Sequence, residues 1–277
     1  MKSNLLIKLL LLFIILPHAS YAVITPTYSI NSATIRNVLE KVKISSLVLI
    51  NIDDTIITPK SMMFRPNSSY RGFIEELNSL AKYNSNIDTI IAKLLLQRQV
   101  MLVESDWAKF IEQLKNKGAL VFGFTKTCNS YSRIKNFEQW KYEQLRGLGI
   151  SFTDKINDKE LFKFDNDKGS PSFYKGIIFT NSFNKTQTLK KFMSIINFLP
   201  YNVIIIENKR GELNDIDNFL KTINLDYYGI EYLAFEELKG IPNDGVVKIQ
   251  KEFLLKTGNW LEDEEALKII NNQIPSR

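Results

Sequence analysis

Short apolar runs alternate along this chain with segments of helical periodicity, and this alternation restricts the fold more than any other feature. Runs such as Val48-Leu49-Ile50 are continuous and rich in β-branched residues, which is typical of strands buried on both faces. Strands that alternate with helices predict an α/β fold with a mainly parallel sheet and right-handed crossovers. The expected strands are 47–50, 119–124, 176–180, 203–206 and 228–233, and the expected helices are 33–43, 70–80, 87–103, 106–117, 131–145, 185–198, 212–223 and 261–270.

Two stretches lack a regular pattern. Residues 23–32 contain Pro26, and residues 151–172 are polar and rich in turn-forming side chains. We therefore expect both stretches to be irregular.

The first 22 residues have the three parts of a secretory signal. Basic Lys2 and Lys8 lead into an unbroken apolar run at 9–16, and small side chains, ending with Ala22, precede Val23. We expect cleavage before Val23 and export to the periplasm or beyond. The alternative is an uncleaved anchor, but the apolar run is shorter than the about 20 residues of a helical span. No stable membrane anchor is therefore expected after cleavage.

The inventory of reactive side chains excludes several kinds of chemistry. His18, the only histidine, lies in the expected signal, and Cys128 is the only cysteine. The mature chain therefore cannot build a Ser-His-Asp or Cys-His mechanism, a His-ligated metal site or an internal disulfide. The net charge of +6 is spread along the sequence without a dense Lys/Arg block, so no nucleic-acid partner is expected. Carboxylate, hydroxyl, amide and Lys/Arg chemistry remains.

Polar side chains stand at the ends of several expected strands. Asn51 and Asp53 follow the first strand, Thr125 ends the next, and Glu207 follows residues 203–206. In parallel α/β folds, ligands bind beyond the carboxyl ends of the strands, so these side chains are candidates for one site. Asp53 and Asp54 taken alone would fit a simple turn after a strand, because Asp is common there. A Mg²⁺ ion, which prefers carboxylates and phosphate oxygens, is one reason for an acidic cluster at a strand end.

The run Val48-Leu49-Ile50-Asn51-Ile52-Asp53-Asp54-Thr55-Ile56 resembles the first motif of the haloacid dehalogenase (HAD)-like superfamily, a hydrophobic strand followed by Asp-x-Asp-x-Thr. Residues 121–125 resemble the second motif, and residues 203–208 stand in the place of the fourth. Lys185 suits the third-motif lysine, with Lys190 as a rival. Residues 125–152, 174–180 and 260–263 are also similar to one family of secreted bacterial HAD-like proteins that carries a domain-of-unknown-function label.

The resemblance implies a fold and a set of roles. The fold is a HAD-like Rossmannoid three-layer sandwich over residues 23–277, with a small helical cap insertion at 58–105. Asn51 takes the position of the phosphate-attacking nucleophile, and Asp53 takes that of the general acid/base. Thr125 and Lys185 would hold phosphoryl oxygens, with Thr55 in support. Asn51, Asp53 and Glu207 would face Mg²⁺.

Two departures from the family pattern limit the expected activity. Asn51 stands where the nucleophilic Asp is usual, and an amide oxygen is a poor nucleophile and a neutral ligand. Glu207-Asn208 stands where paired Asp is usual, so Mg²⁺ binding is expected to be weak or absent. We therefore expect a pseudo-phosphatase that binds a phosphorylated small molecule or a protein partner. The alternative is an active Mg²⁺-dependent phosphohydrolase in which Asp53 attacks, as in an Asp-x-Thr motif shifted by two residues.

Overall fold

The structure is a computed structural model that describes residues 23–126, 133–154, 156, 159–166 and 169–273. Three features of the sequence analysis lie outside these residues: the expected signal at 1–22, Cys128, and the start of the helix expected at 131–145. Among the described residues, no helix is long and apolar enough to cross a membrane.

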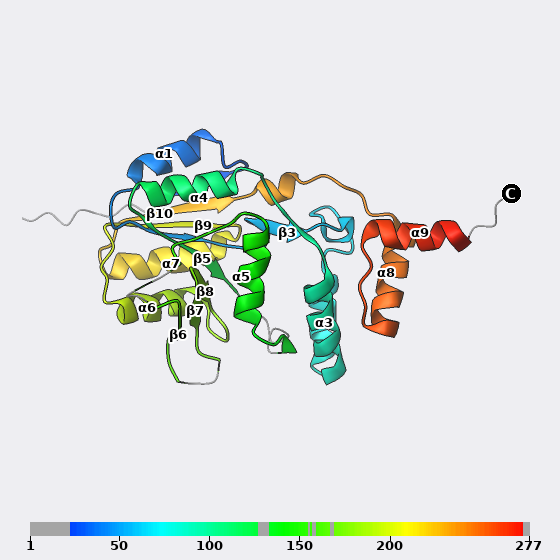
Figure 1. The fold of residues 1–277 in the computed structure, drawn as a ribbon. Coiled ribbons are helices and arrows are strands. Elements are labelled where there is room, and N and C mark those ends of the chain that lie inside the picture. The colour runs from blue at the N-terminus through cyan, green and yellow to red at the C-terminus, as the bar shows by residue number, and fades with distance from the viewer. Residues whose placement is uncertain (1–22, 127–132, 155, 157–158, 167–168, 274–277) are drawn as a thin grey trace, which may run out of the picture.

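A mainly parallel sheet forms the centre of the protein (Figure 1). Within the described residues it has eight strands in the order β1-β10-β9-β2-β5-β8-β7-β6. The pairs from β1 to β8 are parallel, whereas β7 is antiparallel to both β8 and β6. The strands are β1 Val23–Thr27, β2 Leu47–Ile50, β5 Leu120–Thr125, β6 Leu161–Lys163, β7 Ser172–Tyr174, β8 Ile177–Phe179, β9 Val203–Glu207 and β10 Tyr227–Tyr232.

Helices cover both faces of the sheet, so the fold has three layers (Figure 1). Successive residues of β2 point to opposite faces: Val48 and Ile50 belong to one hydrophobic core, and Leu47 and Leu49 belong to the other. Because both faces are covered, all four side chains are fully buried, which explains the continuous apolar run. The first face holds α1 Ala33–Lys41, α4 Trp107–Asn116 and α5 Phe137–Gly147, and the second holds α6 Lys185–Ile196 and α7 Arg210–Thr222.

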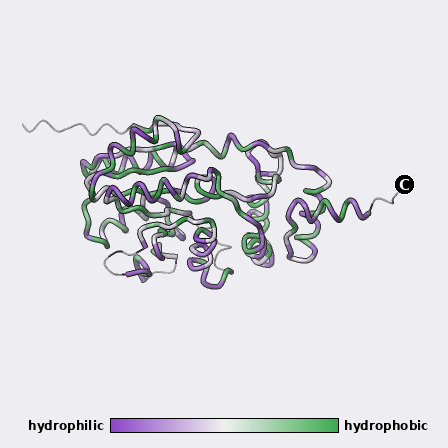
Figure 2. Tube along the Cα trace, turned by 45° about the horizontal axis from the view of Figure 1, so that its top comes forward, coloured by the Kyte–Doolittle hydropathy of each residue, from purple (hydrophilic) through white to green (hydrophobic). Residues whose placement is uncertain are grey.

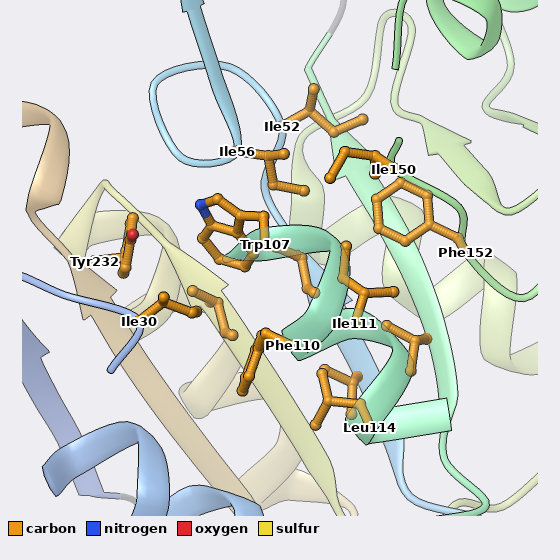
Figure 3. Close-up of a cluster of buried hydrophobic side chains, with 14 of the residues drawn as sticks. Ile30, Ile52, Ile56, Trp107, Phe110, Ile111, Leu114, Ile150, Phe152 and Tyr232 are labelled. Atoms are coloured by element: carbon orange, nitrogen blue, oxygen red, sulfur yellow. The ribbon is translucent and has the colours of Figure 1, made fainter. Parts of the chain in front are cut away.

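The first core is built around α4 (Figure 3). The ring of Trp107 lies edge-on to that of Tyr232 from β10, with centroids 5.0 Å apart. Along the chain the central strands are mostly hydrophobic, whereas the helices alternate between hydrophobic and hydrophilic residues (Figure 2). This alternation is what a helix with one buried side requires.

Helices α3, α8 and α9 lie beside the sandwich (Figure 1), and α2 packs with α3 and α8 in one hydrophobic cluster; we call these the cap helices. They are α2 Phe73–Ala81, α3 Ser85–Gln97, α8 Asp244–Thr257 and α9 Asp263–Gln273. The antiparallel strands β3 Ile57–Pro59 and β4 Val100–Leu102, with the short helix Met62–Phe64, connect α2 and α3 to the sandwich. Val247, Leu254 and Trp260 from the C-terminal segment pack into the same hydrophobic cluster as α2 and α3.

The C-terminal segment is also tied to the connecting strands by hydrogen bonds. The Asp263 carboxylate accepts from Ser61 Oγ and from the Met62 backbone N–H. Glu262 accepts from the Gln99 N–H at 2.7 Å. The cap group is therefore assembled from two parts of the chain: residues inserted after β2 and residues that follow the last strand of the sheet.

Three expectations about local structure are wrong. The helix expected over 87–103 ends at Gln97, because Arg98 is extended and Val100–Leu102 pairs with β3. Residues 23–32 contain β1, whose parallel pairing with β10 gives no local sequence signal. Residues 151–172 contain β6 and the start of β7, a short antiparallel extension at the edge of the sheet. The helix α8 was not predicted.

Candidate functional site

The chain reverses its direction of strand addition at β2. It continues from β2 to β5 and β8 on one side and later adds β9 and β10 on the other. Crossovers that diverge in this way leave a crevice at the carboxyl ends of the two central strands, which is where open α/β sheets bind ligands. Asn51 immediately follows β2, and its backbone N–H donates to Ile206 O of β9 at 2.8 Å. The crevice is thus bordered by the residues that follow β2 and β9.

Lys185 is the first residue of α6 and is held in place by a capping box. Asn184 accepts from the Gln187 N–H, and the Gln187 side chain accepts from the Asn184 N–H. The Lys185 ammonium donates to the Glu207 carboxylate and, at 2.8 Å, to Asn51 Oδ1. The Lys185 and Glu207 side chains are only 3% and 2% exposed, so this ion pair is shielded from water. Lys190, the rival for this role, lies instead over the Phe219 ring.

Asn51 is bonded at both ends of its amide. Its oxygen faces the Lys185 ammonium, and its nitrogen faces three acceptors: Asp53 O at 2.7 Å, Thr55 Oγ1 at 2.8 Å and Asn208 Oδ1 at 3.2 Å. A carboxylate at this position would have no hydrogens to donate to those oxygens. The local structure is therefore built for an amide.

The Asp53 carboxylate is held by hydrogen bonds from Thr125 and Lys141. Its Oδ1 accepts from Lys141 Nζ at 2.8 Å, and its Oδ2 accepts from Thr125 Oγ1 at 3.1 Å. Burial raises the pKa of Asp53, but the charges of Lys141 and Arg98 and the hydrogen bonds outweigh it, so the pKa lies below its ordinary value. Asp53 is therefore ionised at neutral pH.

Asp54 follows with a positive φ of 55°, a conformation that Asp tolerates better than most residues. Its Oδ1 accepts from Thr58 Oγ1 at 3.0 Å. Burial raises the pKa of Asp54; the Thr58 bond opposes this and the charge of Asp53 adds to it, so the pKa lies above its ordinary value. The two neighbouring carboxyl groups are thus shifted in opposite directions.

Lys141 is the site residue that sequence reasoning missed. Its side chain is 3% exposed, although lysine is seldom fully buried without a partner. In α5 it stands four residues after Phe137 and four before Leu145, both of which pack in the first core. A lysine inside an apolar helical stripe was the available signal, because such a position needs a carboxylate partner.

A cavity of about 370 Å³ opens above these residues, between the sandwich and the cap helices. Its sandwich side includes Asn51, Asp53, Asp54, Lys185, Glu207 and Asn208, and its cap side includes Ile74, Glu75, Asn78, Leu95 and Arg98. Thr125 does not line the cavity; it is buried and reaches it through Asp53. The structure therefore brings all five predicted site residues together, four of them at the cavity wall and Thr125 beneath.

Mg²⁺ is the cofactor that the resemblance implies, with Asn51, Asp53 and Glu207 as ligands. As these residues are arranged, they do not fit the ion. The Lys185 ammonium already takes Asn51 Oδ1 and Glu207, while the Asp53 carbonyl oxygen accepts from the Asn51 amide. Mg²⁺ requires a near-octahedral set of free oxygens, and an ammonium at the same position opposes a second cation.

The fold and cavity define an α/β protein with a cavity at the topological switch point of its sheet. Residues 29–267 match the family described as "Protein of unknown function (DUF2608)", and the chain belongs to this family. "Uncharacterized protein RP296" of Rickettsia prowazekii is 45% identical over 267 residues, which cover 96% of this chain and 97% of that protein. A Chlamydia pneumoniae protein described as a "Putative outer membrane protein" is 25% identical over 175 residues, 63% of this chain and 62% of that protein. No solved structure matches the chain.

Proposed function

We propose that this chain is an exported protein of the HAD-like phosphatase fold that binds a phosphorylated small molecule and turns it over slowly or not at all. The observation that carries the proposal is the state of Asn51. The residue at the nucleophile position is an amide whose oxygen accepts from Lys185 and whose two N–H donors have three acceptor oxygens within hydrogen-bond distance. Such a group can hold a pocket together but has no anionic oxygen with which to attack phosphorus.

The HAD-like part of the proposal is supported by the arrangement of the motifs. Asn51, Glu207 and Lys185 come from three parts of the chain and meet at one end of a three-layer α/β sandwich. An ammonium has three donors, and Lys185 uses two of them on Asn51 and Glu207, which leaves one for a ligand oxygen. The cavity volume of about 370 Å³ favours a small molecule over a protein segment.

The active phosphohydrolase is the second candidate, and the opposite pKa shifts of Asp53 and Asp54 favour it. Neighbouring carboxyl groups whose pKa values are moved apart are typical of nucleophile and acid pairs. In that case Asp53, which is ionised and 41% exposed at its side chain, would attack. Turnover that is lost in Asp53→Ala and unchanged in Asn51→Ala would favour this second function.

Inorganic phosphate is expected to bind the mature wild-type chain equally well in EDTA and in Mg²⁺, because Lys185 supplies the positive charge that a metal would otherwise provide. Isothermal titration calorimetry measures the binding, and hydrolysis of an aryl phosphate is expected to stay near background under both conditions. Lys185→Gln, tested below its melting temperature, should lose binding, whereas Lys190→Gln on the same helix should keep it. A folded wild type that binds no phosphate, or that hydrolyses the aryl phosphate efficiently, would overturn the proposal.

Export is proposed on the residues before Val23, and the Chlamydia pneumoniae relative carries a name that refers to the outer membrane. The expected result is a mature protein that begins at Val23, the first residue of β1. Amino-terminal sequencing of material from the periplasm or medium measures this. Exported protein that retains Met1 would contradict cleavage.

A further inference from the structure

Arg98 stands at the cap side of the cavity, where α3 ends. Its backbone N–H donates to Leu94 O at 2.9 Å, and its guanidinium carbon lies 5.9 Å from the centre of the Phe64 ring. Arg98 lines the same cavity as Asp53 and Asp54, and its positive charge lowers the pKa of both carboxyl groups. The cap therefore contributes this cation to the cavity wall.

Arg98 differs from Lys185 and Lys126, two other cations of the cavity wall, in having no carboxylate partner. Lys185 is paired with Glu207, and Lys126 is paired with Glu212. Within the part of the chain that the structure describes, the Arg98 side chain forms no hydrogen bond or ion pair, and its Nε is buried without an acceptor. The residue as a whole is only half-buried and lines the cavity, so the terminal Nη donors of its guanidinium are open to an oxyanion there.

The acidic residues that line the cavity form no hydrogen bond or ion pair with Arg98 among the described residues, so an anionic ligand can be the acceptor for its guanidinium. Glu75 is exposed at the start of α2, where water solvates its charge. Asp54 accepts from Thr58. Ile74 and Leu95 give the cap side of the cavity an apolar portion. A ligand that reaches from Lys185 to Arg98 would thus meet an ammonium, apolar side chains and a guanidinium.

We infer that the ligand carries two anionic groups, a phosphate held at Lys185 and a second oxyanion, either a carboxylate or another phosphate, held by Arg98. This inference rests on the proposed function, because it assumes that the phosphate binds at Lys185. The planar guanidinium can bind either oxyanion through two parallel hydrogen bonds. Arg98 is accordingly a specificity-determining residue that the cap contributes to the site.

The inference is tested with two probes that share a three-carbon phosphate skeleton, 3-phosphoglycerate and glycerol 3-phosphate. Only the first has a carboxylate. The wild type is expected to bind 3-phosphoglycerate about 10-fold or more tighter by calorimetry, as a charged hydrogen-bonded pair would give. Arg98→Gln should remove this preference. Arg98→Lys should keep part of it, because the charge remains but the planar fork is lost.

Lys93→Gln is the matched control, since Lys93 lies on α3, is exposed and is not part of the cavity wall. It should bind both probes as the wild type does. The same comparison is made for a second phosphate with the 1,3-bisphosphate and the monophosphate of propanediol. If the wild type binds inorganic phosphate but shows equal affinity within both pairs of probes, the proposed role of Arg98 is wrong and the proposed function is not affected. If inorganic phosphate and all probes fail to bind, the proposed function itself is wrong.

Discussion

Lys185→Met is expected to lower the free energy of unfolding by about 3–5 kcal/mol, because it leaves a buried carboxylate without its partner. The Glu207 side chain is 2% exposed, and among the described residues its other donors are the backbone N–H groups of Asn208 and Lys209, at 3.0 and 3.2 Å from Oε1. Lys185→Met also removes the donor to Asn51 Oδ1. Urea unfolding followed by circular dichroism measures the loss.

Substitution of two other lysines shows whether the loss of stability comes from the burial of the ion pair or only from the loss of a positive charge. Lys141→Met is expected to cost less than Lys185→Met, because its partner Asp53 is 41% exposed and water can solvate the carboxylate that is left. Lys190→Met should be close to neutral, since Lys190 lies over an aromatic ring and forms no ion pair among the described residues. The double variant Lys185→Met/Glu207→Gln should be more stable than Lys185→Met. Equal losses for Lys185→Met and Lys190→Met would contradict the buried pair.

Asn51→Asp is expected to turn the site into one that responds to Mg²⁺. The new carboxylate would face the Asp53 carbonyl and Asn208 Oδ1, two oxygens that now accept from the amide, and oxygens so placed repel one another unless a cation lies between them. The variant should therefore melt below the wild type in EDTA and recover in Mg²⁺, whereas the wild type should not respond to the ion. Differential scanning fluorimetry with and without Mg²⁺ measures both effects.

The same substitution supplies an anionic oxygen at the nucleophile position. Loss of a nucleophile costs several orders of magnitude in other enzymes, so Asn51→Asp should hydrolyse an aryl phosphate at least ~100-fold faster than the wild type in Mg²⁺. Asn51→Asp/Asp53→Asn should return to near background. A folded single variant that stays inactive would show that Asn51 is not the only missing part, and Asn208 is the next position to change. A wild type as fast as the variant would refute the pseudo-phosphatase proposal.

The central part of the fold could be predicted from the sequence because its signals are local. Residues of β2, β5 and β9 form apolar runs, and the carboxyl ends of parallel strands share one edge of the sheet. The predicted site residues therefore lie together in the structure. Their bonding could not be predicted, since the contact of Lys185 with both Asn51 and Glu207 depends on how α6 begins.

The features of the fold and of the site that could not be predicted depend on contacts between residues far apart in the sequence. β1 is a strand because β10 lies beside it, and its Pro26 is tolerated at the edge of the sheet. The end of α3 is set by the pairing of β4 with β3. Lys141 has the spacing of a core residue and the chemistry of a surface residue, and only its contact with Asp53 resolves the conflict.

The cap helices come from two distant parts of the chain, and this affects the order in which they are synthesised. α2 and α3 leave the ribosome well before α8, by roughly 150 residues, which at about 5–20 residues per second is on the order of ten seconds. During that interval the apolar faces of α2 and α3 have no Val247, Leu254 or Trp260 to pack against. The last strand of the sheet, β10, ends at Tyr232, shortly before α8 begins at Asp244, so the sheet and the support of the cavity wall that carries Arg98 are both completed near the end of synthesis. The candidate site can therefore take its final form only after α8 and Trp260 have been synthesised.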